Sequence, residues 1–351
     1  MRSKGHDIIV VGTSAGGLDA LDLLISQLPA KLAASIFIVQ HLVADDSGEA
    51  LTRRLGRHKA FAAKLVTEGE RFRPGRIYIA PPDNHLLLTN DRVLVRKGAR
   101  ENRNRPGVDP LFRSAAVAHG SHVIGVVLTG MQDDGTAGLI AIKRCGGLTV
   151  VQDPKDAAYP EMPQSALDSA AVDFCVPVAE MGGVLVKLVA KPHGKTKPVP
   201  KDVRIEAKIA ERVLSDVAEV EGLGRQVPYN CPNCGGVLWE MDTPKVTRFR
   251  CHTGHSFTVP ALLVSQSEKI EEMLWISLRM FEEQRNLLNN LEKTAANRAL
   301  RKSNRQRLGE TQGYINRIRA MLLAPESQKA EDTLTRVKGL MAEPQTAKSA
   351  R

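Results

Sequence analysis

The sequence is poor in aromatic residues and in cysteine. Only 4% of its 351 residues are Phe, Trp or Tyr, and no nucleic-acid-binding motif accompanies the net charge of +10. We therefore expect no nucleic-acid partner and interpret the charge as steering toward a partner or as a contribution to solubility. Five cysteines in a chain of this length do not indicate a disulfide framework. Three of them stand close together beside histidines, which indicates a metal site instead.

The chain also lacks a charged-then-apolar leader and any apolar run of membrane-spanning length. We therefore expect a soluble, cytoplasmic protein without membrane insertion. The length predicts two domains, or one large domain with an appendage, and is sufficient for a full hydrophobic core.

The stretch Asp7–Gly17 reads Asp-Ile-Ile-Val-Val-Gly-Thr-Ser-Ala-Gly-Gly. A β-branched apolar run followed by glycines predicts a buried strand, a sharp turn and a helix start. Ser14 would then lie beyond the carboxyl end of the strand, where open parallel sheets place their ligand sites. The segment also matches G-x-S-x-G, a pattern in which the serine hydroxyl is exposed for nucleophilic attack.

Two phosphate-binding interpretations fit this loop less well. A dinucleotide-binding fingerprint needs G-x-G-x-x-G and an acidic residue after the next strand, whereas the next apolar run ends in Gln40-His41. A P-loop needs a lysine after its second glycine, and none follows Gly16 or Gly17. A nucleophile loop and a plain structural turn both remain open on this motif alone.

Apolar runs and helical repeats alternate over residues 7–190, which predicts a doubly wound α/β domain. Its sheet should be mostly parallel, with an antiparallel edge hairpin formed by residues 85–88 and 92–95. The composition changes to Lys, Pro and Gly over residues 191–203, and a helix is expected over about 204–220. We divide the remainder into a linker and helix, a zinc-ribbon-like module and a helical tail, over residues 191–224, 225–258 and 259–351.

The tail has a heptad pattern that predicts a coiled coil or a helical hairpin. Its seam is expected from two sets of apolar residues spaced by seven: Leu274, Phe281 and Leu288, with Met273, Met280 and Leu287 beside them. Such a seam serves packing more often than ligand binding, so no site is assigned to it.

Two further polar residues follow predicted strands of the same sheet. His41 comes directly after the second strand, and Asp134 follows the apolar run at residues 122–129. Because the carboxyl ends of parallel strands share one edge, we expect both side chains near Ser14. A histidine can take the serine proton and return it, and a carboxylate can orient that histidine. The order Ser, His, Asp disfavours a generic α/β-hydrolase fold, whose order is Ser, Asp, His.

Six segments of the chain carry a further signal. They are Val-Gly-Thr-Ser14-Ala-Gly-Gly, Val-Gln-His41-Leu, Ile-Ala-Pro-Pro-Asp-Asn-His85, Arg105-Pro-Gly-Val-Asp109-Pro-Leu-Phe-Arg-Ser-Ala-Ala, Leu-Thr-Gly-Met131-Gln-Asp-Asp134-Gly and Met162-Pro-Gln-Ser-Ala. In order and spacing they resemble the bacterial chemotaxis methylesterase (CheB) family. The resemblance covers residues 5–190. It implies hydrolysis of glutamyl methyl esters on methyl-accepting chemotaxis receptors, with release of methanol, and deamidation of certain receptor glutamines. Other chemosensory proteins are further candidate partners, and no cofactor is implied for catalysis.

By motif position, the resemblance implies that Ser14 is the nucleophile, His41 the general base and Asp134 its orienting carboxylate. It also places the Met131 amide in the oxyanion hole, and the Ala15 amide at the helix start is the natural second donor.

The chain departs from the family pattern directly before Asp134. The family commonly has Asn there, where this chain has Asp133, so Asp133 could share the role of Asp134. We interpret Gly16 and Gly17 as room for a substrate carbonyl and its oxyanion. The resemblance begins near residue 7, so we expect no receiver domain in this chain and regulation from elsewhere.

The clustered cysteines form two knuckles, Cys231-Pro-Asn-Cys234 and Cys251-His-Thr-Gly-His255. Thiolates and neutral imidazole are the preferred ligands of tetrahedral zinc, so we predict a structural zinc on these four residues. The spacing favours His255 over His252, and it also resembles ribbon appendages on members of the family that lack a receiver.

Two alternatives to the methylesterase hypothesis stay open at this level. The chain could be a non-catalytic signalling or assembly module, or an esterase that acts on another protein substrate. The complete set of Ser14, His41 and Asp134 favours catalysis over assembly.

Overall fold

The computed structural model describes residues 5–58, 60–195, 197–213, 217–241, 245–294 and 297–323. Residues up to Ser265 belong to one compact unit, and residues from Gln266 onward belong to a second. No helix among the described residues is long and apolar enough to cross a membrane.

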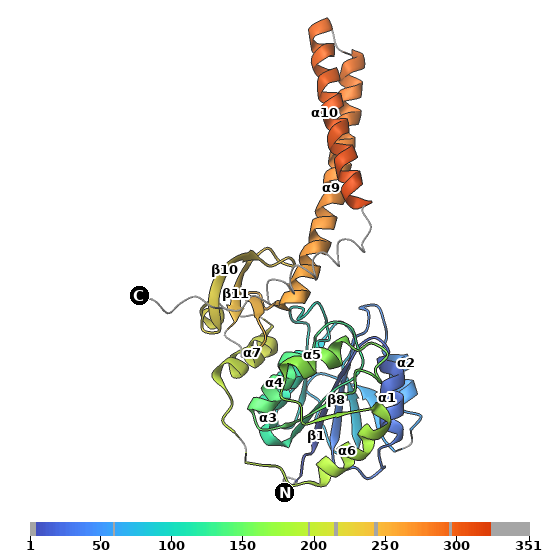
Figure 1. The fold of residues 1–351 in the computed structure, drawn as a ribbon, viewed down its shortest axis with the longest axis vertical. Helices are drawn as coiled ribbons and strands as arrows, with labels where there is room; N and C mark the ends of the chain where they lie inside the picture. Colours follow the sequence, from blue (N-terminus) through green and yellow to red (C-terminus); the bar gives the residue numbers. More distant parts are fainter. Residues whose placement is uncertain are drawn as a thin grey trace. The chain divides into compact units, whose positions relative to one another are not determined.

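Seven strands form the central sheet of the first unit, in the order β3-β4-β2-β1-β7-β8-β9 (Figure 1). All six pairings between neighbouring strands are parallel, so the carboxyl ends of the strands share one edge. The strands are β1 (Ile8–Thr13), β2 (Ser35–Gln40), β3 (Ala62–Leu65), β4 (Arg76–Ile79), β7 (Val123–Val127), β8 (Leu148–Gln152) and β9 (Phe174–Val176).

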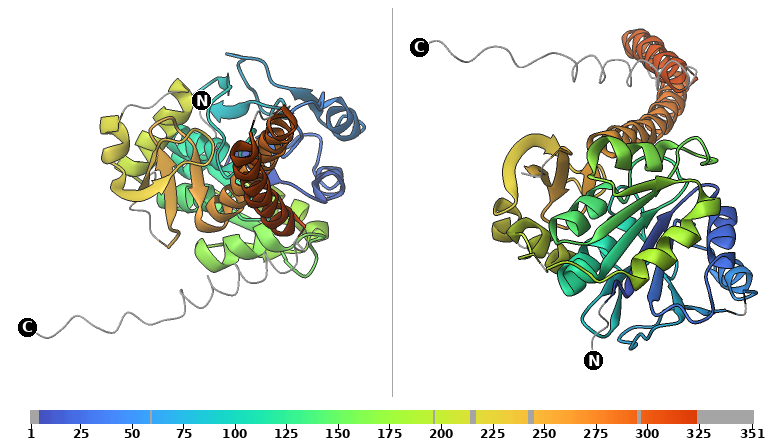
Figure 2. Two further views of the ribbon diagram at one scale, coloured as in Figure 1. Left: turned by 90° about the horizontal axis from the view of Figure 1, so that it is seen from above. Right: turned by 60° about the horizontal axis from the view of Figure 1, so that its bottom comes forward.

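Helices cover both faces of this sheet, which confirms the doubly wound α/β prediction (Figures 1 and 2). The central strand β1 is buried on both sides: Ile8 and Val10 face one core, and Ile9 and Val11 face the other. The first core is closed by α3 (Val108–His119), α4 (Thr136–Arg144) and α5 (Glu161–Ser169). The second is closed by α1 (Gly17–Ser26), α2 (Glu49–Leu55) and α6 (Val178–Ala190).

The predicted hairpin is present, but it forms a separate sheet. β5 (His85–Leu88) and β6 (Val93–Arg96) pair antiparallel with each other and with no strand of the central sheet. The free backbone of β5 meets a helix instead, because the Leu88 N–H donates to the Ser114 hydroxyl of α3 over 3.0 Å. The hairpin therefore packs on α3 rather than extending the edge of the sheet.

A four-stranded antiparallel sheet follows, and we call residues 224–258 the ribbon. It consists of β10 (Gly224–Asn230), β11 (Val237–Met241), β12 (Arg248–Cys251) and β13 (Ser256–Thr258). Two helices precede it, α7 (Lys201–Arg212) and the short α8 (Val217–Glu221). The first begins three residues before the expected position, and Val203 in its first turn packs in the core of the α/β domain.

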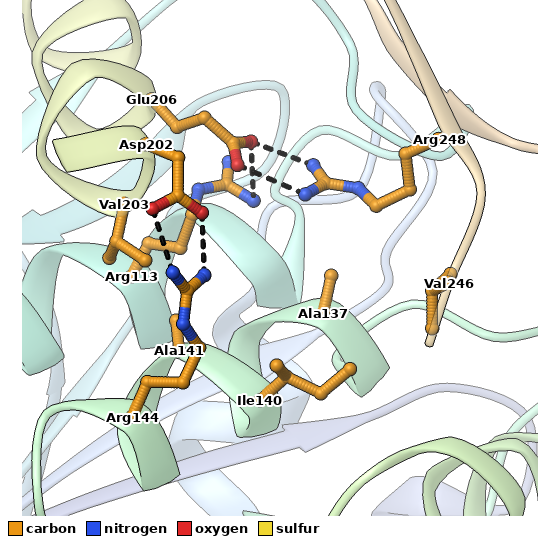
Figure 3. A pocket seen from close by; sticks show the side chains of 10 residues that line it. All are labelled: Arg113, Ala137, Ile140, Ala141, Arg144, Asp202, Val203, Glu206, Val246 and Arg248. Atoms are coloured by element: carbon orange, nitrogen blue, oxygen red, sulfur yellow. Dashed lines mark hydrogen bonds and ion pairs between the residues drawn. The ribbon is translucent and has the colours of Figure 1, made fainter. Parts of the chain in front are cut away.

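Five charged side chains meet where α3, α7 and the ribbon join, and we call them the junction cluster. Its members are Glu101, Arg113, Glu206, Arg248 and Arg250, each at most 3% exposed. Glu206 is its centre: its carboxylate lies 2.8 Å from Arg248 Nη2 and 2.9 Å from Arg250 Nη2. Figure 3 shows Glu206 directed toward Arg113 and Arg248, beside a small pocket. Burial by itself would raise the pKa of Glu206, but these arginines hold it well below its ordinary range.

The second unit contains most of α9 (Val259–Thr294) and α10 (Arg298–Leu322), which pack against each other. The ring centroids of Phe281 and Tyr314 lie 5.2 Å apart with the ring planes tilted by 30°, and Leu288 is buried. The second apolar set of the predicted seam does not take part, since Met273, Met280 and Leu287 are at least 53% exposed.

The junction cluster predicts a strong dependence of stability on Glu206. Replacing Glu206 with Gln leaves buried arginines without their shared carboxylate, which should lower the free energy of unfolding by about 3–5 kcal/mol. Urea unfolding measures this. Glu240→Gln is the matched control, because Glu240 pairs with an arginine that is 78% exposed, and its loss should cost about 1 kcal/mol or less. Equal losses in the two variants would contradict the role of the cluster.

The junction cluster also determines how the stability of the fold changes with pH. Because the pKa of Glu206 is lower in the folded chain than its ordinary value of 4.5, its contribution to stability is complete above that pH and is lost on acidification. Glu206→Gln should therefore flatten the decline in wild-type stability below about pH 4.5.

Candidate active site

Ser14 and His41 directly follow the neighbouring strands β1 and β2. The His41 N–H donates to the Thr13 carbonyl over 3.1 Å, which extends the strand pairing to the edge. The side chain of Gln40 then joins the two loops, because its Nε2 donates to the carbonyl oxygens of Ser14 (2.8 Å) and His41 (3.1 Å). In the sequence Gln40 is marked only as the end of a strand, so this bridge could not be predicted.

The two glycines after Ser14 are required by the backbone and by the packing of the loop. Gly16 has φ of +73°, a left-handed conformation that favours glycine, and it precedes α1. A Cβ on Gly17 would lie 2.2 Å from Gln40 Oε1 and 2.3 Å from Thr13 Oγ1. The absent side chain of Gly17 therefore makes room for Gln40 and Thr13, and the role of the two glycines toward a substrate stays a prediction.

Asp134 lies in the loop after β7 and contacts His41. Its Oδ2 lies 2.9 Å from His41 Nε2, and the two side chains are 1% and 12% exposed. Since a carboxylate only accepts, Nε2 carries the proton in this contact. Burial by itself would raise the pKa of Asp134, but the hydrogen bond from His41 and those from backbone amides hold it below its ordinary value. Asp134 therefore faces His41 as a charged carboxylate.

Asp133 has a different environment from Asp134. It is half-buried, and removal of its carboxyl group from water raises its pKa to about 6. Interaction with the Thr258 side chain at the end of β13, in the ribbon, offsets part of this rise. Of the two aspartates, Asp134 is the one that is hydrogen-bonded to His41.

Asn102 and Asp109 support Asp134, and the sequence analysis assigned a role to neither. Asn102 Nδ2 donates to Asp109 Oδ2 over 2.9 Å and to Asp134 Oδ1 over 3.2 Å. The amides of Val108 and Asp109 also donate to Asp134, over 2.8 and 3.2 Å. Burial and the charge of Asp134 raise the pKa of Asp109 to about 7. The quoted motif around Asp109 was the one signal in the sequence that could have pointed to this pair.

Gly130 lies in the loop after β7 and allows this loop to pack closely against Ser14. A Cβ at this position would lie 2.8 Å from the Ser14 Cβ and 2.2 Å from the Met162 sulfur. Its backbone is held on both sides, by the Tyr159 carbonyl and by the Met162 N–H, each over 3.0 Å. The amide of the next residue, Met131, therefore lies in a fixed loop beside the serine.

The four predicted metal ligands converge in the ribbon. The ligand atoms of Cys231, Cys234, Cys251 and His255 all lie within 4.8 Å of one another, close enough to bind a metal ion. Cys234 Sγ and Cys251 Sγ are 3.7 Å apart, and Cys251 Sγ lies 3.5 Å from His255 Nδ1. A tetrahedral zinc with bonds of about 2.0–2.3 Å would hold neighbouring ligand atoms about 3.5–3.8 Å apart. The donor set and its spacing therefore fit zinc.

The comparisons with known proteins agree with one another. The family model for CheB methylesterase matches residues 9–185. A candidate protein-glutamate methylesterase/protein-glutamine glutaminase of Leptospira interrogans is 38% identical over 184 residues, which are 52% of this chain and 95% of that protein. Protein-glutamate methylesterase/protein-glutamine glutaminase 2 of Xanthomonas oryzae is 36% identical over 188 residues, 52% of each chain.

Solved structures include a similar fold. The crystal structure of the Thermotoga maritima CheB methylesterase catalytic domain is 33% identical with a TM-score of 0.51, and the match covers 54% of this chain and all of that one. The chain belongs to the CheB methylesterase family. It is accordingly a hydrolase.

Because Asp133 and Asp134 have different surroundings, we expect their substitution to affect esterase activity differently. Asp134→Asn removes the charge that faces His41 and should lower kcat by on the order of 10³-fold or more. Asp133→Asn leaves the contact between His41 and Asp134 in place and should have a far smaller effect. Steady-state rates of the two purified variants measure this. Equal losses would mean that Asp133 shares the role of Asp134.

Proposed function

We propose that this protein hydrolyses methyl esters of glutamyl residues on methyl-accepting chemotaxis receptors, releasing methanol, and deamidates receptor glutamines. The observation that carries the proposal is the hydrogen-bonded pair of His41 and the buried Asp134, which lies one strand away from Ser14 at the carboxyl edge of the sheet. Its membership in the CheB methylesterase family and the names of its relatives support the substrate class.

In the proposed mechanism, the Ser14 oxygen attacks the ester carbonyl carbon while His41 takes the hydroxyl proton. His41 Nε2 already donates to Asp134, so Nδ1 is the ring nitrogen that would accept this proton. The resulting imidazolium is stabilised by the charged Asp134 carboxylate. The site thereby supplies a base and its counter-charge without exposing the carboxylate to water.

The oxyanion that forms would be bound by the backbone amides of Ala15 and Met131. Neither amide donates to a protein acceptor among the described residues. Both lie in loops that packing holds in place around Ser14: Ala15 at the start of α1, and Met131 after the constrained Gly130. Preorganised donors of this kind stabilise the charge that develops in the transition state.

Collapse of the tetrahedral intermediate breaks the bond to the methoxy oxygen, and His41 returns the proton to give methanol. A water molecule, activated by His41, then attacks the acyl-enzyme and releases the glutamate carboxylate and free Ser14. A glutamine substrate would follow the same steps with ammonia as the leaving group. We place this reaction at the cytoplasmic helices of the receptors.

We also propose that Cys231, Cys234, Cys251 and His255 hold a structural zinc ion. All four tetrahedral positions would be filled by protein atoms, which leaves none for substrate. The two knuckles are closed by turns at Gly235 and Gly254, whose φ values of +75° and +105° suit glycine. The zinc would cross-link β12 and the loop after β10, and would contribute to ribbon stability.

Ser14→Ala tests the proposed nucleophile. Loss of the hydroxyl should lower the rate of methanol release from methylated receptor by on the order of 10⁴-fold or more, because no covalent intermediate can form. Ser26→Ala is the matched control: Ser26 is exposed at the end of α1 and bonds only to the Leu23 carbonyl among the contacts described. The proposal fails if wild-type protein releases no more methanol than Ser14→Ala.

Metal analysis tests the proposed zinc. Protein purified without chelator should contain about one zinc per chain, and Cys231→Ser should lose the metal together with some resistance of the ribbon to proteolysis. Cys175→Ser is the control, because Cys175 is an exposed cysteine on β9, outside the ligand cluster. Equal zinc contents in the two variants would rule out this ligand set.

A further inference from the structure

Asn102 joins the active site to the ribbon. Its side chain amide donates to Asp109 and Asp134 through Nδ2, and its Oδ1 accepts from the Thr258 N–H over 3.2 Å. Its backbone N–H donates to the Ser256 carbonyl over 2.8 Å. Both ribbon partners belong to β13, which is thus bonded to the residue that contacts the Asp134 carboxylate.

The surroundings permit only one orientation of the Asn102 amide. Two carboxylates on one side require the NH2 group, and a backbone N–H on the other side requires the oxygen. The amide also bridges Asp109 and Asp134, two buried acids whose charges repel each other. Asn102 therefore holds the position of the carboxylate that faces His41.

The backbone at Asn102 depends on outside contacts. Its φ is +47°, a left-handed conformation that non-glycine residues adopt only when surrounding contacts hold them, and asparagine tolerates it better than most. The ribbon supplies such contacts through the preceding residue: Glu101 forms a bridge with Ser256 and an ion pair of 3.1 Å with Arg250 of β12. Asn102 is itself only 1% exposed.

We propose that Asn102 is a positioning residue for Asp134 and that β13 of the ribbon holds Asn102 in place, so that the ribbon supports catalysis without touching substrate. The family match ends at residue 185, so the ribbon lies outside it. The inference rests on the proposed function, because it assumes that Ser14 is activated through His41 and Asp134.

The test compares how fast a fluorophosphonate labels Ser14 in the full-length protein, since this rate reports activation of the serine without a receptor substrate. Asn102→Gly keeps the left-handed backbone and removes the amide; it should slow labelling about 10- to 100-fold and lower kcat for methanol release with KM unchanged. Asn102→Asp should be slower still, because it places a third carboxylate beside two others. Lys245→Gly is the matched control, an exposed ribbon residue with φ of +70°.

The ribbon side is tested by Thr258→Pro, which deletes the N–H that donates to Asn102. It should slow labelling, whereas Thr258→Val retains the N–H and should label faster than the proline variant. In the double variant Asn102→Gly/Thr258→Pro, the proline should add little, because both changes act through the same amide. Urea unfolding of each variant shows that labelling is measured on folded protein.

The outcomes separate the two proposals. Wild-type protein that is labelled but releases no methanol counts against the receptor substrate alone, and the labelling rates still decide the role of Asn102. Labelling of Asn102→Gly at the wild-type rate overturns the positioning role. Effects of Asn102→Gly and Thr258→Pro that multiply in full, or a Thr258→Pro protein that labels normally, overturn the link to the ribbon. Wild-type protein that is not labelled at Ser14 overturns both proposals.

Discussion

A carboxylate as deeply buried as Asp134 keeps its charge only while N–H groups are directed at it, and the candidate site depends on this constraint. The donors come from separate parts of the chain: His41 after β2, Asn102 in the loop before α3, Val108 at the start of α3, and Gly135 beside Asp134 itself. No single loop could provide them. The charged form of Asp134 is therefore a property of the assembled edge of the sheet, and the ability of His41 to act as a base follows from it.

The junction cluster applies a similar constraint on a larger scale. Its two carboxylates and three arginines are each costly to bury alone, so they are stable only when the catalytic fold, α7 and the ribbon are packed together. Buried ion pairs are weak evidence of net stability, but they tolerate few alternative arrangements. The cluster thus fixes how β12 meets Glu101, and Glu101 is the neighbour of Asn102. The junction cluster holds Glu101, and the next residue, Asn102, donates a hydrogen bond to Asp134, so the position of the cluster bears on the geometry at Asp134.

Much of the fold could be predicted from the sequence because it depends on local patterns. Apolar runs placed β1, β2 and β7 correctly, and the cysteine spacing identified the ligand cluster that the structure brings together. The separate hairpin could not be predicted, because an antiparallel pair has the same pattern whether it joins a sheet or packs on α3. The exposure of Met273, Met280 and Leu287 was missed for a similar reason: a heptad pattern identifies a helix pair without showing which apolar row is covered.

The sequence by itself determined which residues could carry out the chemistry and that they lie at the ends of strands, because strand periodicity and loop motifs are local properties. Only the tertiary structure decided which of two adjacent aspartates faces His41, and that Gly17 makes room for Gln40. It also decided that Asn102 lies between Asp134 and the ribbon, more than 150 residues away along the chain from Thr258. These contacts join residues that are distant in sequence, and hydrogen-bond geometry between such residues exists only once the chain has packed.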